Sequence, residues 1–225
     1  MTMLGAGLGA VDRHEEHLDV LLAQQEVLKA LPDHQRERMN HLGNLAHCYT
    51  KLGKHKQAVD LHRRLLKIIS LQHGESSEHT FSIISSLALA LHKAGEMSEA
   101  KDLLREHIPV AERTFGREHD MTIGLRWTYA NLLREDATNG ETLASDLVDA
   151  FRTFESIAEL WRRQRPKNDP DLMGIEKTLK LAGDDLNRLA EYLQAAGMEN
   201  AVERFREVVG DVIGPRETQS GPGEA

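Results

Sequence analysis

Apolar residues recur every three or four positions along most of the chain, a spacing that favours one face of an α-helix. The pattern predicts a first helix from His14 to Leu31, which Pro32 and Asp33 interrupt. Gly53 separates two further helices, and glycine favours the end of a helix. The apolar faces of these two helices comprise Leu42, Leu45, Ala46, Tyr49 and Leu52, and then Ala58, Leu61, Leu65, Ile68 and Ile69.

The same spacing returns 42 residues later, where Leu87-Ala88 repeats Leu45-Ala46 and Gly95 repeats Gly53. It begins a third time with Ile123, Trp127, Ala130 and Leu133 and then loses register, because the segment 136–140 is about two residues longer than its counterparts. We therefore predict full repeats at about 39–80 and 81–122 and a diverged third at 123–163, within an array spanning 12–163. A C-terminal helix pair at 164–213, a flexible N-terminus at 1–11 and a disordered tail at 214–225 complete the predicted organisation.

The repeat predicts an all-α fold, since neither helix of a pair can bury its apolar face alone. Stacking successive pairs buries one continuous core, and the small residues Ala46, Ala88 and Ala130 allow close packing. The expected architecture is an α-solenoid of antiparallel helix pairs in a right-handed superhelix. Such arrays present an extended concave surface.

Several residues in and after the first full repeat match a known pattern: Asn44-Leu45-Ala46, Tyr49, Gly53-Lys54, Ala58 and the turn at Gly116–Thr122. The stretch resembles the 42-residue tetratricopeptide repeats of the kinesin light chain type, best over residues 32–135. The resemblance implies that the first helix of each pair lines a groove. It also implies that the asparagine before Leu-Ala binds a peptide backbone. Asn44 carries this asparagine, whereas Ser86 and Thr128 occupy the later equivalent positions.

Composition narrows the functional classes. The net charge of −8 disfavours a general nucleic-acid binder, whose surface is usually basic. The single cysteine, Cys48, excludes an internal disulfide framework and fits a reducing compartment. No apolar run approaches the roughly 18–20 residues that span a bilayer, and the N-terminus lacks the basic residues of a signal peptide. We expect a cytoplasmic protein that binds neither membranes nor nucleic acid.

The sequence contains no motif that is typical of catalysis, metal binding or cofactor binding. His14 and His17 flank two glutamates, but the zinc-protease helix places its histidines four residues apart, not three. His47 and Cys48 are adjacent and therefore point about 100° apart on a helix, which does not suit a base and its thiol. The glycines at 5–9 follow no predicted strand and do not form a dinucleotide loop. We expect no metal, no cofactor and no enzymatic activity.

Two features leave alternatives open. Residues 51–67 carry one acid, Asp60, against six basic residues: Lys51, Lys54, Lys56, Arg63, Arg64 and Lys67. This patch is either a solvated helix face or a site for an acidic peptide or phosphate-bearing partner. Trp127 and Tyr129 are either aromatic anchors for a partner or residues packed between neighbouring helices.

The sequence thus favours a non-catalytic protein–protein interaction scaffold that binds a partner peptide, of acidic character, in the concave groove. The predicted groove residues are Asn44, Lys51, Ser86, Trp127, Thr128 and Asn131. The alternative is a structural or regulatory repeat fragment that self-associates or serves as an arm of a larger signalling assembly. The sequence leaves the oligomeric state open.

Overall fold

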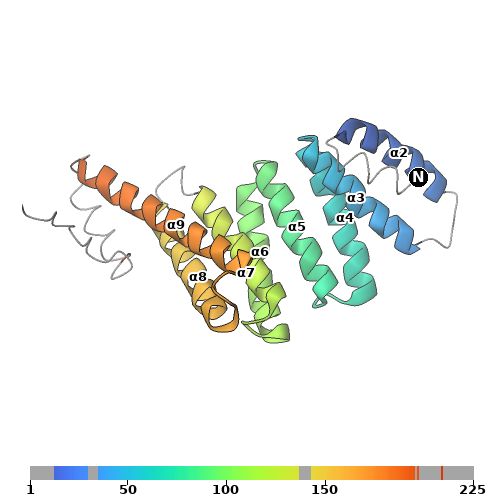
Figure 1. The fold of residues 1–225 in the computed structure, drawn as a ribbon. Helices are drawn as coiled ribbons and strands as arrows, with labels where there is room; N and C mark the ends of the chain where they lie inside the picture. Colours follow the sequence, from blue (N-terminus) through green and yellow to red (C-terminus); the bar gives the residue numbers. More distant parts are fainter. Residues whose placement is uncertain (1–12, 30–34, 137–142, 196, 198–208, 210–225) are drawn as a thin grey trace, which may run out of the picture. The chain divides into compact units, whose positions relative to one another are not determined.

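The computed structural model describes residues 13–29, 35–136, 143–195, 197 and 209 of the chain. Within these residues the regular elements are all helices and no strand occurs, which confirms the predicted all-α class (Figure 1). In chain order the helices are α2 (His14–Lys29), α3 (Gln35–Lys51), α4 (His55–His73), α5 (Glu78–Lys93), α6 (Met97–Phe115), α7 (Asp120–Asp136), α8 (Leu143–Gln164) and α9 (Pro170–Ala195). The glycines at 5–9, the flexible N-terminus at 1–11, the tail at 214–225 and, except for Val209, the helix expected from Glu199 to Ile213 lie outside the described residues.

The chain divides into two compact units, Met1–Leu132 and Leu133–Ala225. The division falls within α7, the first helix of the diverged third repeat. The domain boundaries drawn from the sequence remain predictions. None of the helices described is long and apolar enough to cross a membrane.

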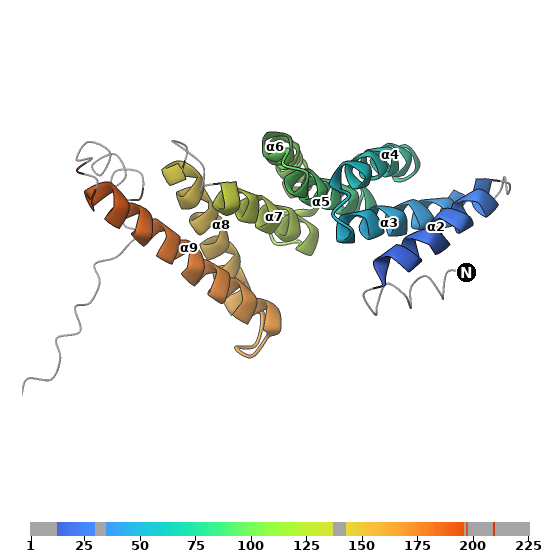
Figure 2. The same cartoon turned by 90° about the horizontal axis from the view of Figure 1, so that it is seen from above.

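Consecutive helices pack against one another in the first unit, so that α4 contacts both α3 and α5, and α5 also contacts α6. Figure 2 shows α3 beside α4 and α5 beside α6 as successive pairs. The core of this unit contains the predicted Ala58, Leu87 and Ala88, and with them Phe81, Leu91, Ala100 and Leu104. The alanines are fully buried and therefore sit where neighbouring helices approach most closely.

Glycines end the first helix of both full repeats in the same way. Gly53 and Gly95 have φ values of 71° and 83°, a left-handed conformation that costs glycine little. The amide of the next residue returns to the helix in each case, from Lys54 to the Tyr49 carbonyl and from Glu96 to the Leu91 carbonyl, both at 2.9 Å. The predicted helix stops are therefore confirmed at both positions.

The second unit contains the helix pair α8 and α9, which pack against each other. Leu147, Val148, Leu186, Leu189 and Val209 form its buried cluster, with Phe151 and Ala190 packed against it. An ion-pair network fixes the turn between the two helices. The Arg165 guanidinium lies 4.4 Å from the centre of the Trp161 ring and pairs with Asp169 at 3.2 Å and Asp171 at 2.7 Å.

Candidate functional site

One face of α3 carries a row of exposed polar side chains. Arg36, Asn40, Asn44, His47 and Lys51 follow one another at intervals of three or four residues, which places them on one side of the helix. The opposite side of α3 supplies the buried residues Leu45 and Cys48. The sequence therefore assigns one side of α3 to the core and the other to solvent.

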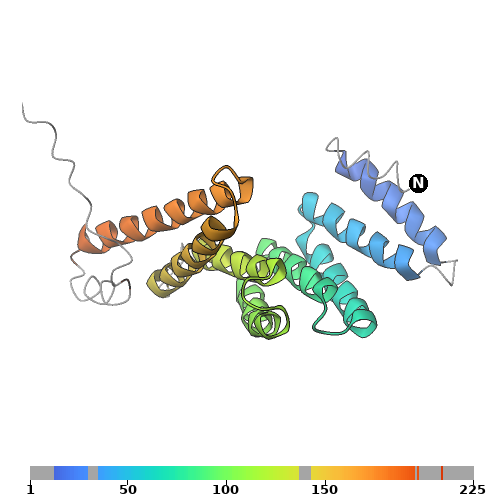
Figure 3. The ribbon, with the colours of Figure 1, turned by 60° about the horizontal axis from the view of Figure 1, so that its bottom comes forward.

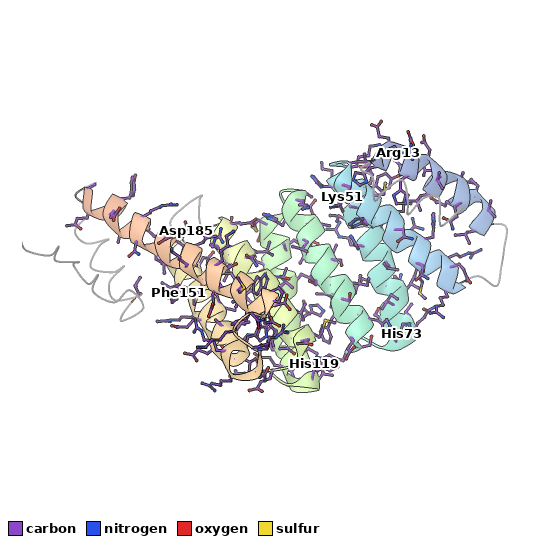
Figure 4. The ribbon with its side chains drawn as sticks, in the orientation of Figure 1. Arg13, Lys51, His73, His119, Phe151 and Asp185 are labelled. Carbon is purple, nitrogen blue, oxygen red and sulfur yellow. The ribbon has the colours of Figure 1, made fainter. Side chains whose placement is uncertain are left out.

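Next to this row lies a pocket of about 1130 Å³, formed by α3, α4 and α5. Its apolar lining is Met39, Leu65, Ile69 and Ile83, and its polar lining is Arg36, Asn40, Asn44, Gln72, His73, His79 and Ser82, with Gly43 between them. The His73 and His79 rings stack at 4.7 Å between centroids across the turn from α4 to α5. Lys51 and His73 lie at opposite ends of the first full repeat (Figure 4).

Of the six predicted groove residues, Asn44 lies in the pocket. Its side chain is exposed and makes no hydrogen bond within the described part of the chain. Lys51 is also exposed, at the C-terminal end of the same helix, and forms no ion pair there. Both side chains are therefore available to a ligand. The other lining residues of the pocket were not predicted as site residues.

The positions of α5 that correspond to the exposed row on α3 are less polar. Ser82, Ser86, Leu89 and Lys93 stand 42 residues after Asn40, Asn44, His47 and Lys51. The Ser86 side chain is half-buried, and its hydroxyl donates to the Ser82 carbonyl at 3.0 Å. The Leu89 side chain is 45% exposed, which leaves an apolar position between a serine and a lysine.

The three predicted residues on α7 have different surroundings. The side chain of Thr128 is only 8% exposed, and its hydroxyl donates to the Gly124 carbonyl at 2.9 Å and lies 3.3 Å from Ser85 Oγ on α5. It thus joins α5 to α7 and does not face the solvent. Trp127 and Asn131 are half-buried, and the Asn131 amide donates to the Trp127 carbonyl at 3.0 Å. The hydrogen-bonding groups of Thr128 and Asn131 are therefore largely used within the protein.

The two aromatic residues on α7 differ in their packing. Tyr129 packs against the core of the first unit, so for this residue the alternative of packing between helices is confirmed. The half-buried Trp127 stays a predicted anchor.

The basic patch of residues 51–67 is partly neutralised. Arg63 on α4 pairs with Glu99 at 2.7 Å and with Glu96 at 3.4 Å, both at the start of α6. The hydrogen bond to Glu99 is the main cause that raises the pKa of Arg63. This residue therefore links successive repeats, whereas Lys51 at the end of α3 is exposed and takes no part in these ion pairs.

Positive groups from three helices gather around His47. Burial lowers the pKa of His47, and Lys51 on α3, His14 on α2 and Lys93 on α5 lower it further. These groups disfavour further positive charge at this end of α3.

Two features of the described residues bear on metal binding and catalysis, namely the groups that could bind a metal ion and the single cysteine. No group of three or more His, Cys, Asp or Glu side chains among them is placed to hold a metal ion. Cys48 is buried, its thiol donates to the His14 carbonyl at 3.3 Å, and burial raises its pKa. A buried thiol that stays protonated is a poor nucleophile.

Comparison with known proteins now identifies the repeats. Residues 37–113 match the family model of the tetratricopeptide repeat. Among curated protein sequences none matches the chain significantly.

Solved structures resemble the chain in fold. One contains nearly identical tetratricopeptide-like repeats of a candidate kinesin light chain from Podosopora anserina. It is 17% identical with a TM-score of 0.60, over 97% of this chain and 95% of that one. A single-substitution variant of the same protein is 18% identical with a TM-score of 0.61, over 93% of both chains. BtubC (BKLC) from P. vanneervenii is 17% identical with a TM-score of 0.52, over 100% of this chain and 81% of that one.

Three observations agree on the presence of helical repeats. They are the helix pairs, the glycine at the end of the first helix of both full repeats, and the family match at residues 37–113. Arrays of this kind offer extended surfaces to other proteins. Over residues 37–113 the chain is therefore similar to tetratricopeptide repeats.

Proposed function

We propose that this protein is a non-catalytic interaction scaffold, and that the pocket formed by α3, α4 and α5 binds an extended segment of a partner protein. The observation that carries the proposal is the pocket itself. It places the exposed Asn44 amide, which has no hydrogen bond within the described residues, above a floor that contains Leu65 and Ile69.

An extended peptide needs two kinds of contact that this pocket offers. Its backbone has donors and acceptors, and the amides of Asn40, Asn44 and Gln72 supply both. Its apolar side chains need a surface that excludes water, which Leu65 and Ile69 provide. Backbone contacts together with a few side-chain pockets are a common mode of peptide recognition.

The charge at the end of α3 suggests the character of the segment. Lys51 and Lys93 occupy equivalent positions of the two full repeats, are exposed and form no ion pair within the described residues. We propose that they attract acidic side chains of the partner and raise the association rate. Ser86, Trp127 and Asn131 stay proposed contacts further along the array. Because Thr128 is buried, we expect its part to be the positioning of α7 on α5.

The test is selection against an unbiased displayed peptide library with the full-length chain, followed by affinity measurement on an enriched peptide. Asn44→Ala should weaken binding about 3- to 10-fold, the value of one or two lost hydrogen bonds. The fold should be retained, since the Asn44 side chain is exposed and makes no hydrogen bond to another described residue. Gln57→Ala, an exposed amide on α4 that does not line the pocket, is the matched control and should bind normally.

Two outcomes would contradict this proposal. Equal affinity for the Asn44→Ala variant and the unmodified protein would remove the pocket from the binding site. If the library yields no enriched peptide and the mass in solution is that of a dimer or larger, self-assembly through the repeats becomes the better account.

A further inference from the structure

Helix α2 precedes the matched repeats and covers one side of the first of them. Figure 3 shows α2 running alongside α3, and Leu18 and Leu21 of α2 share one buried cluster with Leu45, Ala46 and Cys48 of α3 and Leu61 of α4. This surface of α3 and α4 is the one on which a preceding helix pair would stack in a longer array.

The two ends of α2 are fixed by hydrogen bonds to α3. The Cys48 thiol donates to the His14 carbonyl at 3.3 Å, and the Arg38 guanidinium donates twice to the Leu28 carbonyl, at 3.0 and 2.9 Å. These contacts make α2 and α3 antiparallel. His41 lies about one turn along α3 from Arg38, and Gln24 lies about one turn along α2 from Leu28.

Along α2 and α3 between these fixed ends, and on the neighbouring α4, some buried polar atoms have no partner among the described residues. The side chain of His41 is only 4% exposed, and neither ring nitrogen has a hydrogen-bond partner among the described residues. The same holds for Oε1 of Gln24 and for Nδ1 of His62 on α4, whose side chain is 9% exposed. Polar groups buried without partners cost free energy, and an imidazolium in such a place costs much more.

The pKa is lowered for four histidines in this region. Burial lowers the pKa of His41 and of His62, and His47 lowers that of His62 further. Burial also lowers the pKa of His17 on α2, with additional effects of His14 and His47. Burial is again the main cause for His47, followed by Lys51, His14 and Lys93.

The acids of α2 do not offset this positive charge. Glu15, Glu16, Asp19 and Glu26 all have exposed side chains, and Glu16 pairs with Arg13 at 3.1 Å. Asp60, the acid of α4, is exposed and acts on Arg63 at the other side of that helix. The charged groups that act on His17, His47 and His62 are imidazoles and ammonium groups, and burial alone acts on His41.

The direction in which pH changes the docking of α2 follows from the linkage between protonation and conformation. His17 lies on α2, His41 lies on α3 between the residues that bond to α2, and His14 of α2 contributes to the lowered pKa of His47. In an open form the pKa values of these three histidines are therefore expected to rise toward the ordinary 6.5 or so. The open form therefore binds more protons. The docking of α2 is fully favoured above a pH of about 6.5 and weakens as the pH falls below that value. The closed-to-open equilibrium shifts by up to about tenfold per pH unit for each histidine that takes up a proton.

We propose that α2 is an acid-released cover of the first repeat: at mildly acidic pH it leaves α3 while the remaining repeats stay folded. Release uncovers the apolar side of α3 and α4 that contains Leu45 and Leu61. The surface concerned is different from the proposed peptide pocket, which the same helices form with α5.

Cys48 is a natural reporter of this release, because it is the single cysteine of the chain, is 0% exposed and contacts α2. Its labelling with 4,4′-dithiodipyridine, which reacts with thiols in mild acid, is measured between pH 7.5 and 5.0 on the full-length chain. Each rate is divided by that of free cysteine at the same pH. In parallel, hydrogen exchange of the α5 and α6 amides, corrected for the intrinsic effect of pH, monitors the rest of the first unit.

The relative labelling rate should rise at least tenfold between pH 7 and 5.5, with unchanged protection of α5 and α6. His41→Leu should reduce this rise several-fold, and the double change His17→Gln with His47→Gln should reduce it independently. His107→Gln, on the more distant α6, is the control and should leave the rise intact.

Three results would overturn the proposal. They are a labelling ratio that does not change with pH, a loss of α5 and α6 protection in parallel with labelling, and a full acid response in both His41→Leu and the double variant. The double variant alters half-buried and exposed side chains, so it remains informative if His41→Leu does not fold.

Discussion

Replacing Phe81 by alanine tests how the first unit is held together. Phe81 is 0% exposed on α5, and its ring meets Phe115 edge-on at 5.8 Å between centroids and His107 at 6.5 Å. Large-to-small changes of this kind cost about 3–5 kcal/mol through lost burial and the remaining cavity. Each aromatic contact contributes about 0.5–1.5 kcal/mol beyond its area. We therefore expect a loss near the upper end of that range.

The assay is urea unfolding followed by far-UV circular dichroism, with hydrogen exchange to locate the loss. Leu71→Ala is the matched control: this leucine on the adjacent helix α4 is 79% exposed, so its removal should cost less than about 0.5 kcal/mol. Phe154→Ala, at a fully buried position of α8, should instead lower protection mainly in the second unit. If Phe81→Ala cost no more than Leu71→Ala, or if it lowered protection equally in both units, the reasoning would be refuted.

Three further predictions use the same unfolding assay. Gly95→Ala should lower the free energy of unfolding by about 1–2 kcal/mol, because the φ of this residue is 83°. Gly124→Ala should raise it by about 0.5–1 kcal/mol, because Gly124 is in a helix and nothing lies within 4 Å of the added Cβ. Equal effects of the two changes would contradict the backbone argument. Arg63→Ala should cost less than about 1 kcal/mol, and the cost should shrink in 1 M salt, as expected of an exposed ion pair; a salt-independent loss would point to packing. Thr128→Val should cost about 1 kcal/mol through the lost hydroxyl contacts and should leave peptide affinity unchanged, which a binding measurement checks.

The sequence contained enough information for the fold of the two full repeats. Their apolar spacing and the recurrence of Gly53 at Gly95 predicted helix pairs, and the structure has α3 to α6 at those places. This succeeded because local propensity and the 3.6-residue period agree with the tertiary packing. The division of the chain within α7 was not predicted, since compactness depends on contacts between residues far apart in sequence.

The site was predicted less completely. Asn44 was identified through its place before Leu-Ala, and the exposed row from Arg36 to Lys51 could have been found from its three- and four-residue spacing. The contributions of α4 and of the start of α5, such as Gln72 and His79, depend on how two helices meet, which a single helical period does not encode. The same limit applies to Thr128, whose burial depends on α5.

The three repeats offer progressively less to a ligand at equivalent positions. The position of Asn40 becomes Ser82 and then Gly124, so that a side chain with two kinds of hydrogen-bonding group is shortened and then lost. The position of Asn44 becomes Ser86 and then Thr128, and its side chain passes from exposed to half-buried to buried.

Charge changes along the array in the same direction. The position of Lys51 is again a lysine at Lys93 but is Glu135 in the third repeat, so its sign reverses. An acidic segment would be attracted by Lys51 and Lys93 of the two full repeats. Polar groups, exposure and charge thus all favour recognition on the two full repeats, which lie in or next to the residues that match the family model. If a partner segment reaches α7, the contacts that we propose there are the half-buried Trp127 and Asn131.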